Sequence, residues 1–205
     1  MTPAPHRTRV PRGPLAWTEI SPLAPFTLAD GSGPPEQGTE VRLVWDPWGL
    51  HVRFDCADRD AWGTYTRRDD PLYEEEAVEV FLAPGDLAPV RYVEVEVSPG
   101  GVLFDATIEN PTSLRRDLVA DPSWDCPGIV WRAGPGSRSQ DWWAEIAIPW
   151  AGLELGSPPA VCRANFYRIE RPRDGEAEFS CWSPTLTSPA DFHKPARFGV
   201  LELAP

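Results

Sequence analysis

Two neighbouring segments of the chain alternate acidic and apolar residues at the period of a β-strand. Residues 75–84 read EEAVEVFLAP, and residues 91–101 read RYVEVEVSPGG. Because every second side chain of a strand points to the same face, Glu79 shares a face with Phe81. By the same rule Tyr92, Glu94 and Glu96 share a face, and the valines between them point the other way. The pattern predicts two strands with acids and aromatics on one surface and aliphatic side chains on the opposite one.

Short segments of this kind recur along the chain, and turn residues separate them. No segment shows sustained helical periodicity, and the 25 prolines and 16 glycines suit many short strands joined by turns. The expected strands cover residues 41–45, 50–57, 77–83, 90–97, 103–108, 129–132, 142–148, 161–170, 178–182 and 197–203. This pattern predicts an all-β protein, an immunoglobulin-like β-sandwich of two antiparallel sheets with about ten strands.

The first part of the chain differs in composition from the rest. Residues 1–39 are rich in proline and glycine, which predicts an irregular N-terminal segment that packs on the body of the protein. Within it, residues 17–20 and 26–28 could form short edge strands. Nothing after residue 39 suggests a further boundary, so residues 40–205 are expected to form one sandwich domain, a usual length for this architecture.

The balance of charge limits the partners that this chain can have. Asp and Glu number 31 against 19 Lys and Arg, so the formal net charge is −12. An acidic chain without a basic stripe argues against nucleic acid and against anionic membrane surfaces as partners. Lys194 is the single lysine of the sequence. Neighbouring acids without lysine repel each other unless arginine or a ligand pairs with them, which favours a binding face or an internal ionic network over a plain solvated face.

The cysteines and the N-terminus bear on the cellular compartment. The four cysteines form no CxxC pair, so a zinc site is not supported. Cys56 falls in an apolar strand pattern that favours a buried thiol. If the protein is exported, the four cysteines could instead form two disulfides. No apolar run follows the basic first residues, so no signal peptide and no transmembrane helix are expected. We expect a cytoplasmic protein from the sequence as it stands, and a secreted one if the chain has been trimmed.

Several aromatic residues lie beside polar loops rather than inside apolar patterns. Tyr73 precedes a run of three glutamates, and Trp182 stands at a strand end in the segment FSCWSP. Aromatic faces stack on the C–H faces of sugar rings, and carboxylates and arginine bind the hydroxyl groups. Core packing is the better interpretation for three other tryptophans, Trp45, Trp131 and Trp142.

Other chemistries compete with sugar binding. Glu79 with Glu94 or Glu96 could form the carboxylate pair of a glycoside hydrolase, whereas no GxSxG motif and no Ser/His/Asp set support acyl transfer. The acidic face could also be a structural network that binds no sugar. A haem held by His51 and His193 is conceivable but has no supporting motif, and the only methionine, Met1, begins the chain.

Calcium is a further candidate ligand. Asp58, Asp60, Asp69 and Asp70 lie in one polar loop, and Asp121 and Asp125 lie in another. Clustered aspartates can bind this hard cation, but EF-hand spacing is absent. No other cofactor is expected.

An ordered series of six segments resembles the family 9 carbohydrate-binding modules, and more closely their family-9-like relatives in the DOMON-like superfamily. The series is LYEEEAVEVFL, YVEVEVSPGG, WWAEIAIPW, RANFYR, WSP and FHKPARFG, and the resemblance spans residues 41–203. The resemblance implies an immunoglobulin-like sandwich whose concave face binds a mono- or oligosaccharide between two aromatic rings, with calcium in some members. The chain departs from the sugar-binding members in two places, with Tyr at position 73 in place of Trp and Glu94 or Glu96 in place of an arginine.

Position by position, the resemblance assigns the two aromatic rings to Tyr73 and Trp182. It assigns the polar contacts to acids, an amide and an arginine. The expected ligand-binding residues are therefore Tyr73, Glu79, Glu94, Glu96, Asn165, Arg168 and Trp182, and no catalytic residue is expected. The predicted function is non-catalytic carbohydrate binding, linked to polysaccharide catabolism.

Overall fold

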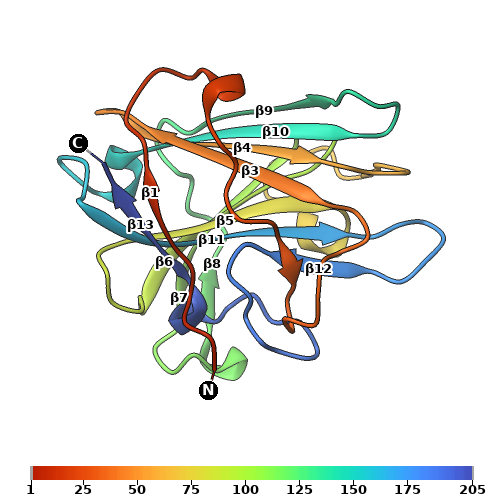
Figure 1. The fold of residues 1–205 in the computed structure, drawn as a ribbon. Helices are drawn as coiled ribbons and strands as arrows, with labels where there is room; N and C mark the ends of the chain where they lie inside the picture. The colour runs from red at the N-terminus through yellow and green to blue at the C-terminus, as the bar shows by residue number, and fades with distance from the viewer. Residues whose placement is uncertain (1, 205) are drawn as a thin grey trace.

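Thirteen strands form two stacked β-sheets in the computed structural model, which describes residues 2–204. One sheet has four strands and the other nine, and Figure 1 shows the four-stranded sheet lying across the larger one. The strands are β1 (Arg7–Val10), β2 (Thr27–Leu28), β3 (Thr39–Trp45), β4 (Gly49–Cys56), β5 (Ala77–Pro84), β6 (Arg91–Val97), β7 (Leu103–Glu109), β8 (Val119–Asp121), β9 (Val130–Pro135), β10 (Trp142–Pro149), β11 (Val161–Glu170), β12 (Glu178–Cys181) and β13 (Gly199–Leu203). The predicted all-β sandwich is confirmed, with three strands more than expected.

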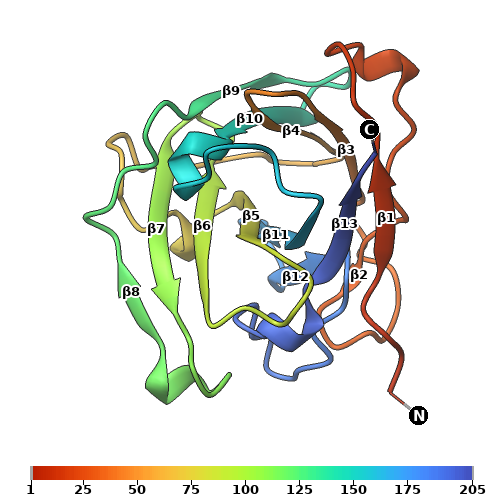
Figure 2. The same ribbon diagram turned by 90° about the vertical axis from the view of Figure 1, so that its left-hand side faces the viewer.

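The strand order places the acidic segments in the middle of the larger sheet. The small sheet runs β3-β4-β10-β9, and the large sheet runs β1-β13-β11-β5-β6-β7-β8, with β12 beside β11 and β2 beside β12. Figure 2 shows β8 at one edge of the large sheet and β1 at the other. Because β5 and β6 are flanked on both sides, their side chains form the centre of each face of this sheet.

As predicted from the sequence, the side chains of β5 and β6 point alternately to the two faces of the sheet. Val78, Val80 and Val95 are fully buried in the core between the sheets. Phe81 and Tyr92 lie on the other face, in a second apolar cluster. The second cluster exists because Leu72 of η2 (Leu72–Glu74) and loop residues such as Phe192 cover part of the outer face of the large sheet. The other 3₁₀ helices are η1 (Trp17–Glu19), η3 (Arg115–Asp117), η4 (Trp150–Leu153) and η5 (Pro195–Arg197).

The N-terminal segment contributes more regular structure than its composition indicates. β1 pairs with β13 in parallel, and β2 pairs with β12. The residues expected as an edge strand near Trp17 form η1 instead. Proline-rich chain can still add edge strands, because the edge of a sheet requires fewer backbone donors.

Two further observations concern the described residues. None of their helices has the length and apolar character that crossing a bilayer requires. All four cysteines are buried and free, so the disulfides left open by the sequence do not form in this structure. Burial raises the pKa of the Cys56 thiol to about 12, which keeps that thiol protonated and unreactive.

Candidate functional site

A cleft of about 730 Å³ lies on the outer face of the large sheet. Its floor includes Glu79 of β5 and Glu94 of β6, and aromatic walls come from Tyr73 of η2 and Phe179 of β12. Tyr73 is 46 % exposed and packs edge-on against Phe104 of β7 at 5.8 Å between ring centroids. Cavities that hold small ligands measure about 300–1,000 Å³, so this cleft has the size of a binding site.

Three carboxyl groups gather beneath the cleft. Glu79 is the direct cross-strand partner of Glu96, and Glu94 lies opposite Phe81. Oxygen atoms of Glu79, Glu94 and Glu96 lie within 4.8 Å of one another, and all three residues are buried. Neither carboxylate oxygen of Glu96 has a hydrogen-bond partner among the residues that the structure describes. In the part of the chain that the structure describes, none of the three forms an ion pair with lysine or arginine, so polar groups at the floor stay available to a ligand.

Burial changes the protonation of these carboxyl groups. Desolvation raises the pKa of Glu94 to about 7. It raises the pKa values of Glu79 and Glu96 well above the usual range, and the neighbouring glutamates add to the rise. Arg115, on the rim of the cleft, opposes the rise for Glu79 and Glu94. At neutral pH the floor therefore contains protonated as well as ionised carboxyl groups. Together these groups can donate hydrogen bonds to sugar hydroxyl groups and accept hydrogen bonds from them.

A loop of residues 187–194 forms the wall between the cleft and the C-terminal strands. The Tyr92 hydroxyl lies 2.8 Å from Nδ1 of His193, and the Tyr167 hydroxyl donates to the Phe192 carbonyl at 2.9 Å. Lys194 forms an ion pair with Asp191 at 2.5 Å. Burial lowers the pKa of His193 to about 3, so this histidine is neutral. These bonds position the wall before any ligand binds.

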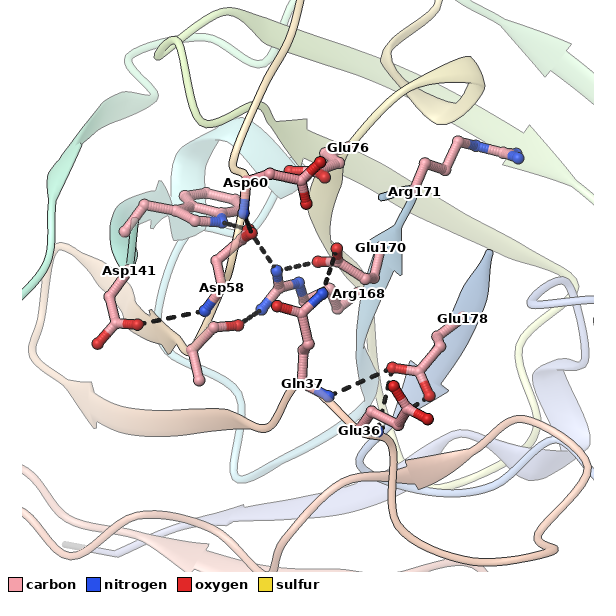
Figure 3. A network of polar contacts seen from close by, with 12 residues as sticks. Glu36, Gln37, Asp58, Asp60, Glu76, Asp141, Arg168, Glu170, Arg171 and Glu178 are labelled. Atoms are coloured by element: carbon pink, nitrogen blue, oxygen red, sulfur yellow. Dashed lines mark hydrogen bonds and ion pairs between the residues drawn. The ribbon is translucent and has the colours of Figure 1, made fainter. Parts of the chain in front are cut away.

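Arg168, expected at the binding face, points the other way. It alternates with Tyr167 on β11, so its side chain enters the interior of the sandwich and is fully buried. Its guanidinium donates to Asp58 at 2.7 Å, to the carbonyl of Ala57 at 2.7 Å and to Glu170. Figure 3 shows this network. The structure therefore corrects the expectation that Arg168 contacts sugar together with Glu79.

Trp182 and Asn165 also lie away from the cleft. Trp182 is 1 % exposed and packs in the core against Phe166, with ring centroids 5.8 Å apart. A Cβ atom at Gly199 would collide with its indole ring. The fully buried Asn165 side chain donates to the Ser183 carbonyl at 2.8 Å and accepts from the Ser183 amide at 2.9 Å. Both residues support the fold, and the expected aromatic pair of Tyr73 and Trp182 is not brought together.

The second aromatic wall is Phe179, which is not among the binding residues expected from the sequence. β12 pairs with β11 so that Cys181 lies opposite Tyr167. Phe179 stands two residues before Cys181 and therefore faces the cleft, whereas Trp182 takes the opposite face. Arg171 packs over the Phe179 ring at 5.2 Å and donates to the Tyr73 carbonyl at 3.3 Å. The alternation in the segment EFSCW separates Phe179 from Trp182, and the pairing of β12 with β11 decides which of them faces the cleft.

A second cleft, of about 720 Å³, lies over the small sheet and the N-terminal segment. It contains Trp143, but its charged groups are already paired. Arg53 bonds Asp55 at 2.8 Å and Glu145 at 2.6 Å, and it covers the Trp143 ring at 4.8 Å. The paired charges leave fewer free groups for a ligand than the floor of the first cleft does.

The residues considered for haem are not brought together. His51 lies on β4 in the small sheet and is 3.1 Å from Asp46, whereas His193 lies in the cleft wall beside Tyr92. Met1 lies outside the described residues. The geometry gives no common axis on which both histidines could bind one iron.

Comparison of the sequence with known proteins gives a partial match. No family model matches the chain. A curated protein described as an extracellular protein of Arthroderma benhamiae is 26 % identical over 144 residues, which are 65 % of this chain and 64 % of that protein. The chain therefore aligns with only about two thirds of that relative.

Solved structures match nearly the whole chain. One match is a candidate carbohydrate-binding protein from Bacteroides uniformis, with a TM-score of 0.79 and 15 % identity. The superposition covers 97 % of this chain and 99 % of that protein. A family 9 carbohydrate-binding module from Caldicellulosiruptor kristjanssonii, solved with cellotriose, covers 96 % of this chain, and 93 % of that chain is covered, at a TM-score of 0.64 and 14 % identity. The same module solved with glucose also gives a TM-score of 0.64. The chain thus has the fold of a family 9 carbohydrate-binding module.

Proposed function

We propose that this protein binds a mono- or oligosaccharide in the cleft between Tyr73 and Phe179 without cleaving it. The observation that carries the proposal is an aromatic-walled cleft whose buried floor acids, Glu79 and Glu94, have no ion-pair partner among residues 2–204. Sugar rings present C–H faces to aromatic side chains and hydroxyl groups to carboxyl groups. A role in polysaccharide catabolism fits such a module, because binding retains the protein on its polymer.

The fold neighbours guide the choice of ligand. The module from Caldicellulosiruptor kristjanssonii was solved with glucose and with cellotriose. We therefore propose glucose and short β-glucans as the first ligands to test on this chain. Calorimetric titration with glucose, cellobiose and cellotriose should detect binding, and a wider glycan array covers other sugars.

Tyr73→Ala is expected to weaken sugar binding without unfolding the protein. Each aromatic stack contributes about 0.5–1.5 kcal/mol beyond its buried area, which corresponds to a loss of about 2- to 12-fold in affinity. Trp48→Ala is the matched control, because Trp48 is 44 % exposed and lies in the turn before β4, stacked on His51. Calorimetry that finds Tyr73→Ala equal to the parent protein, or finds both variants equally weakened, would contradict the assignment of this cleft.

Phe179→Ala tests the second wall and separates it from the tryptophan nearby. We expect it to weaken sugar binding by about the same 2- to 12-fold, since it removes the other aromatic face. Trp182→Phe is expected to lower the melting temperature and to leave the affinity of the folded protein unchanged, because its ring lies in the core. If Trp182→Phe lost binding while Phe179→Ala kept it, Trp182 would be the ligand contact.

The non-catalytic part of the proposal has its own test. Retaining glycosidases hold two carboxyl groups about 5–5.5 Å apart, and the floor acids lie within 4.8 Å of one another. Glu79 of β5 and Glu94 of β6 both lie in the floor of the cleft, on one side of a bound sugar, whereas the carboxyl pair of a glycosidase flanks the scissile bond. Incubation with a panel of chromogenic glycosides should therefore give no turnover. Turnover that disappears in Glu79→Gln would show that the cleft is an active site.

A further inference from the structure

The cross-strand partners of the three acids beneath the cleft include no lysine or arginine on the described strands. Glu79 and Glu96 lie directly opposite each other, with Tyr167 on the far side of Glu79 and Phe104 on the far side of Glu96. The cross-strand partners of Glu94 are apolar. Like charges directly opposite each other destabilise a sheet. A cation supplied by a ligand would remove this repulsion.

Glu96 shows most clearly that a donor is missing from this group. Its side chain is fully buried, yet neither of its carboxylate oxygens has a hydrogen-bond partner among residues 2–204. One of these oxygens lies within 4.8 Å of an oxygen of Glu79 and of an oxygen of Glu94, the two acids that line the cleft. A buried acceptor with no donor is costly, so we look for the donor in the molecule that occupies the cleft.

We propose that the cleft binds an amino sugar, whose ammonium group lies among Glu79, Glu94 and Glu96. The inference rests on the proposed function and specifies its class of ligand. An ammonium group has three N–H donors, one for each carboxyl group, whereas a hydroxyl group has a single donor. Charge-assisted bonds of about 2.7–2.9 Å from a tetrahedral nitrogen hold three oxygens about 4.4–4.7 Å apart. The oxygens of the three acids, which lie within 4.8 Å of one another, fit this geometry.

The walls of the cleft suit the ring that carries the amine. Tyr73 and Phe179 present aromatic faces to the C–H groups of a sugar. Aromatic faces also attract cations, so the walls favour an ammonium group over a carboxylate. The chemistry of the floor and that of the walls therefore point to the same ligand, a sugar with a free amine.

Two cations on the rim do not take the place of this amine. Arg115 and Lys194 line the cleft, but both lie beside Asp191, at 3.8 Å and 2.5 Å. The Arg115 side chain is 68 % exposed, so water and salt screen its charge. Its charge lowers the pKa values of Glu79 and Glu94 without reversing the rise that burial causes. The buried floor therefore still lacks a cation.

Protons neutralise the floor when no ligand is bound. Burial raises the pKa of Glu94 to about 7 and raises the pKa values of Glu79 and Glu96 well above the usual range. A neighbouring cation favours the ionised form of a carboxyl group. Binding of an amino sugar should therefore release protons from the floor, whereas a neutral sugar brings no charge and should release none.

Calorimetric titration with glucosamine, glucose and N-acetylglucosamine tests the inference, in EDTA so that no metal ion competes with the amine. We expect glucosamine to bind at least about tenfold more tightly than the other two. N-acetylglucosamine is the matched control, because its acetyl group removes the charge and leaves the ring unchanged. Glucuronic acid, an anion, should bind more weakly than glucose.

Proton release is measured at about pH 6 in two buffers with different heats of ionisation. The amine already carries its charge at that pH, as an α-amino group with a pKa of about 7.7–8.0 does. His193 stays neutral, because burial lowers its pKa to about 3. We expect about one proton or more to be released per glucosamine and none per glucose.

Matched variants assign the preference to the floor. E79Q and E94Q should each lower the ratio of the glucosamine affinity to the glucose affinity by about tenfold. Tyr73→Ala should weaken the binding of both sugars and keep the ratio. Glu109→Gln removes the same charge at the exposed end of β7 and should also keep the ratio.

The outcomes separate this inference from the proposed function. Equal affinities for glucosamine and glucose would overturn the inference and leave the proposed function standing, and so would tighter binding of glucuronic acid than of glucosamine. Failure of every sugar to bind would overturn both. Tight glucosamine binding without proton release, or a ratio that Glu109→Gln lowers as much as E94Q does, would show that the amine does not bind at the floor.

Discussion

Arg168→Met is expected to lower the free energy of unfolding by about 3–5 kcal/mol. The guanidinium is fully buried and bonds Asp58, Glu170 and the Ala57 carbonyl. It also lies over the Trp142 ring at 5.7 Å. Its removal leaves the carboxylates buried with no compensating charge, which costs far more than the lost contacts. Thermal unfolding in EDTA should show a melting temperature lower by roughly 6–20 °C for a domain of this size.

Arg53→Met is the matched control for this effect. Arg53 also lies on a strand, pairs with two carboxylates and covers a tryptophan ring, but its side chain is 20 % exposed. Water and salt screen such a partly exposed pair, so its removal should cost about 1 kcal/mol. If both variants lost the same free energy of unfolding, burial would not be the reason for the contribution of Arg168 to stability.

The stability of the protein is expected to fall as the pH rises above neutral, because of the carboxyl groups beneath the cleft. The pKa values of Glu79 and Glu96 lie well above the usual range in the folded state. Between the unfolded and folded pKa values the native state binds more protons than the unfolded state. The stabilisation is therefore complete below about pH 4.5 and is lost as the pH rises through the folded values. Each such proton changes the free energy of unfolding by about 1.4 kcal/mol per pH unit.

Other groups that face these acids limit the pH window for the measurement. The pKa of His193 is about 3 in the folded state and near 6.5 in the unfolded state. Below about pH 6.5 this histidine therefore makes the stability rise with pH, opposite to the effect of the acids. Tyr73, Arg115, Asp191 and Lys194 also line the cleft. Between pH 7 and pH 9 the histidine no longer titrates in either state, so the melting temperature should follow the acids.

Glu96→Gln identifies the contribution of these acids. The amide keeps the shape of the side chain but removes one buried proton site and its repulsion of Glu79 and Glu94. The melting temperature of the variant, measured in EDTA from pH 7 to pH 9, should fall less steeply, by roughly 3–6 °C per pH unit. Acids elsewhere, including Glu76, titrate in both proteins and cancel in the comparison. Parallel curves for the two proteins would contradict the prediction.

Much of the fold could be read from local pattern. The alternation in residues 75–84 and 91–101 correctly separates Glu79 and Glu94 from the valines of the core, since the period of two is a property of each strand alone. The same rule, applied to RANFYR, puts Arg168 on the face of Phe166 rather than that of Tyr167. The resemblance to carbohydrate-binding modules placed Arg168 at the ligand nonetheless, and the alternation was the better guide.

The second aromatic required knowledge of strand pairing. Phe179 and Trp182 lie three residues apart, so they point to opposite faces of the sheet. Which of the two faces the cleft depends on the register of β12 against β11, where Cys181 lies opposite Tyr167. A one-residue change in register exchanges the faces of a strand, so the sequence alone left this choice open.

The sequence by itself determined the all-β class and the acid-rich face of β5 and β6, because the period of a strand is a local property. Only the tertiary structure decided which distant residues meet. It formed the cleft from η2, β12 and the loop of residues 187–194, and it brought Glu76 and Glu170 to Asp58 and Asp60. These contacts join residues far apart in the chain, so they depend on how the sheets pair and pack.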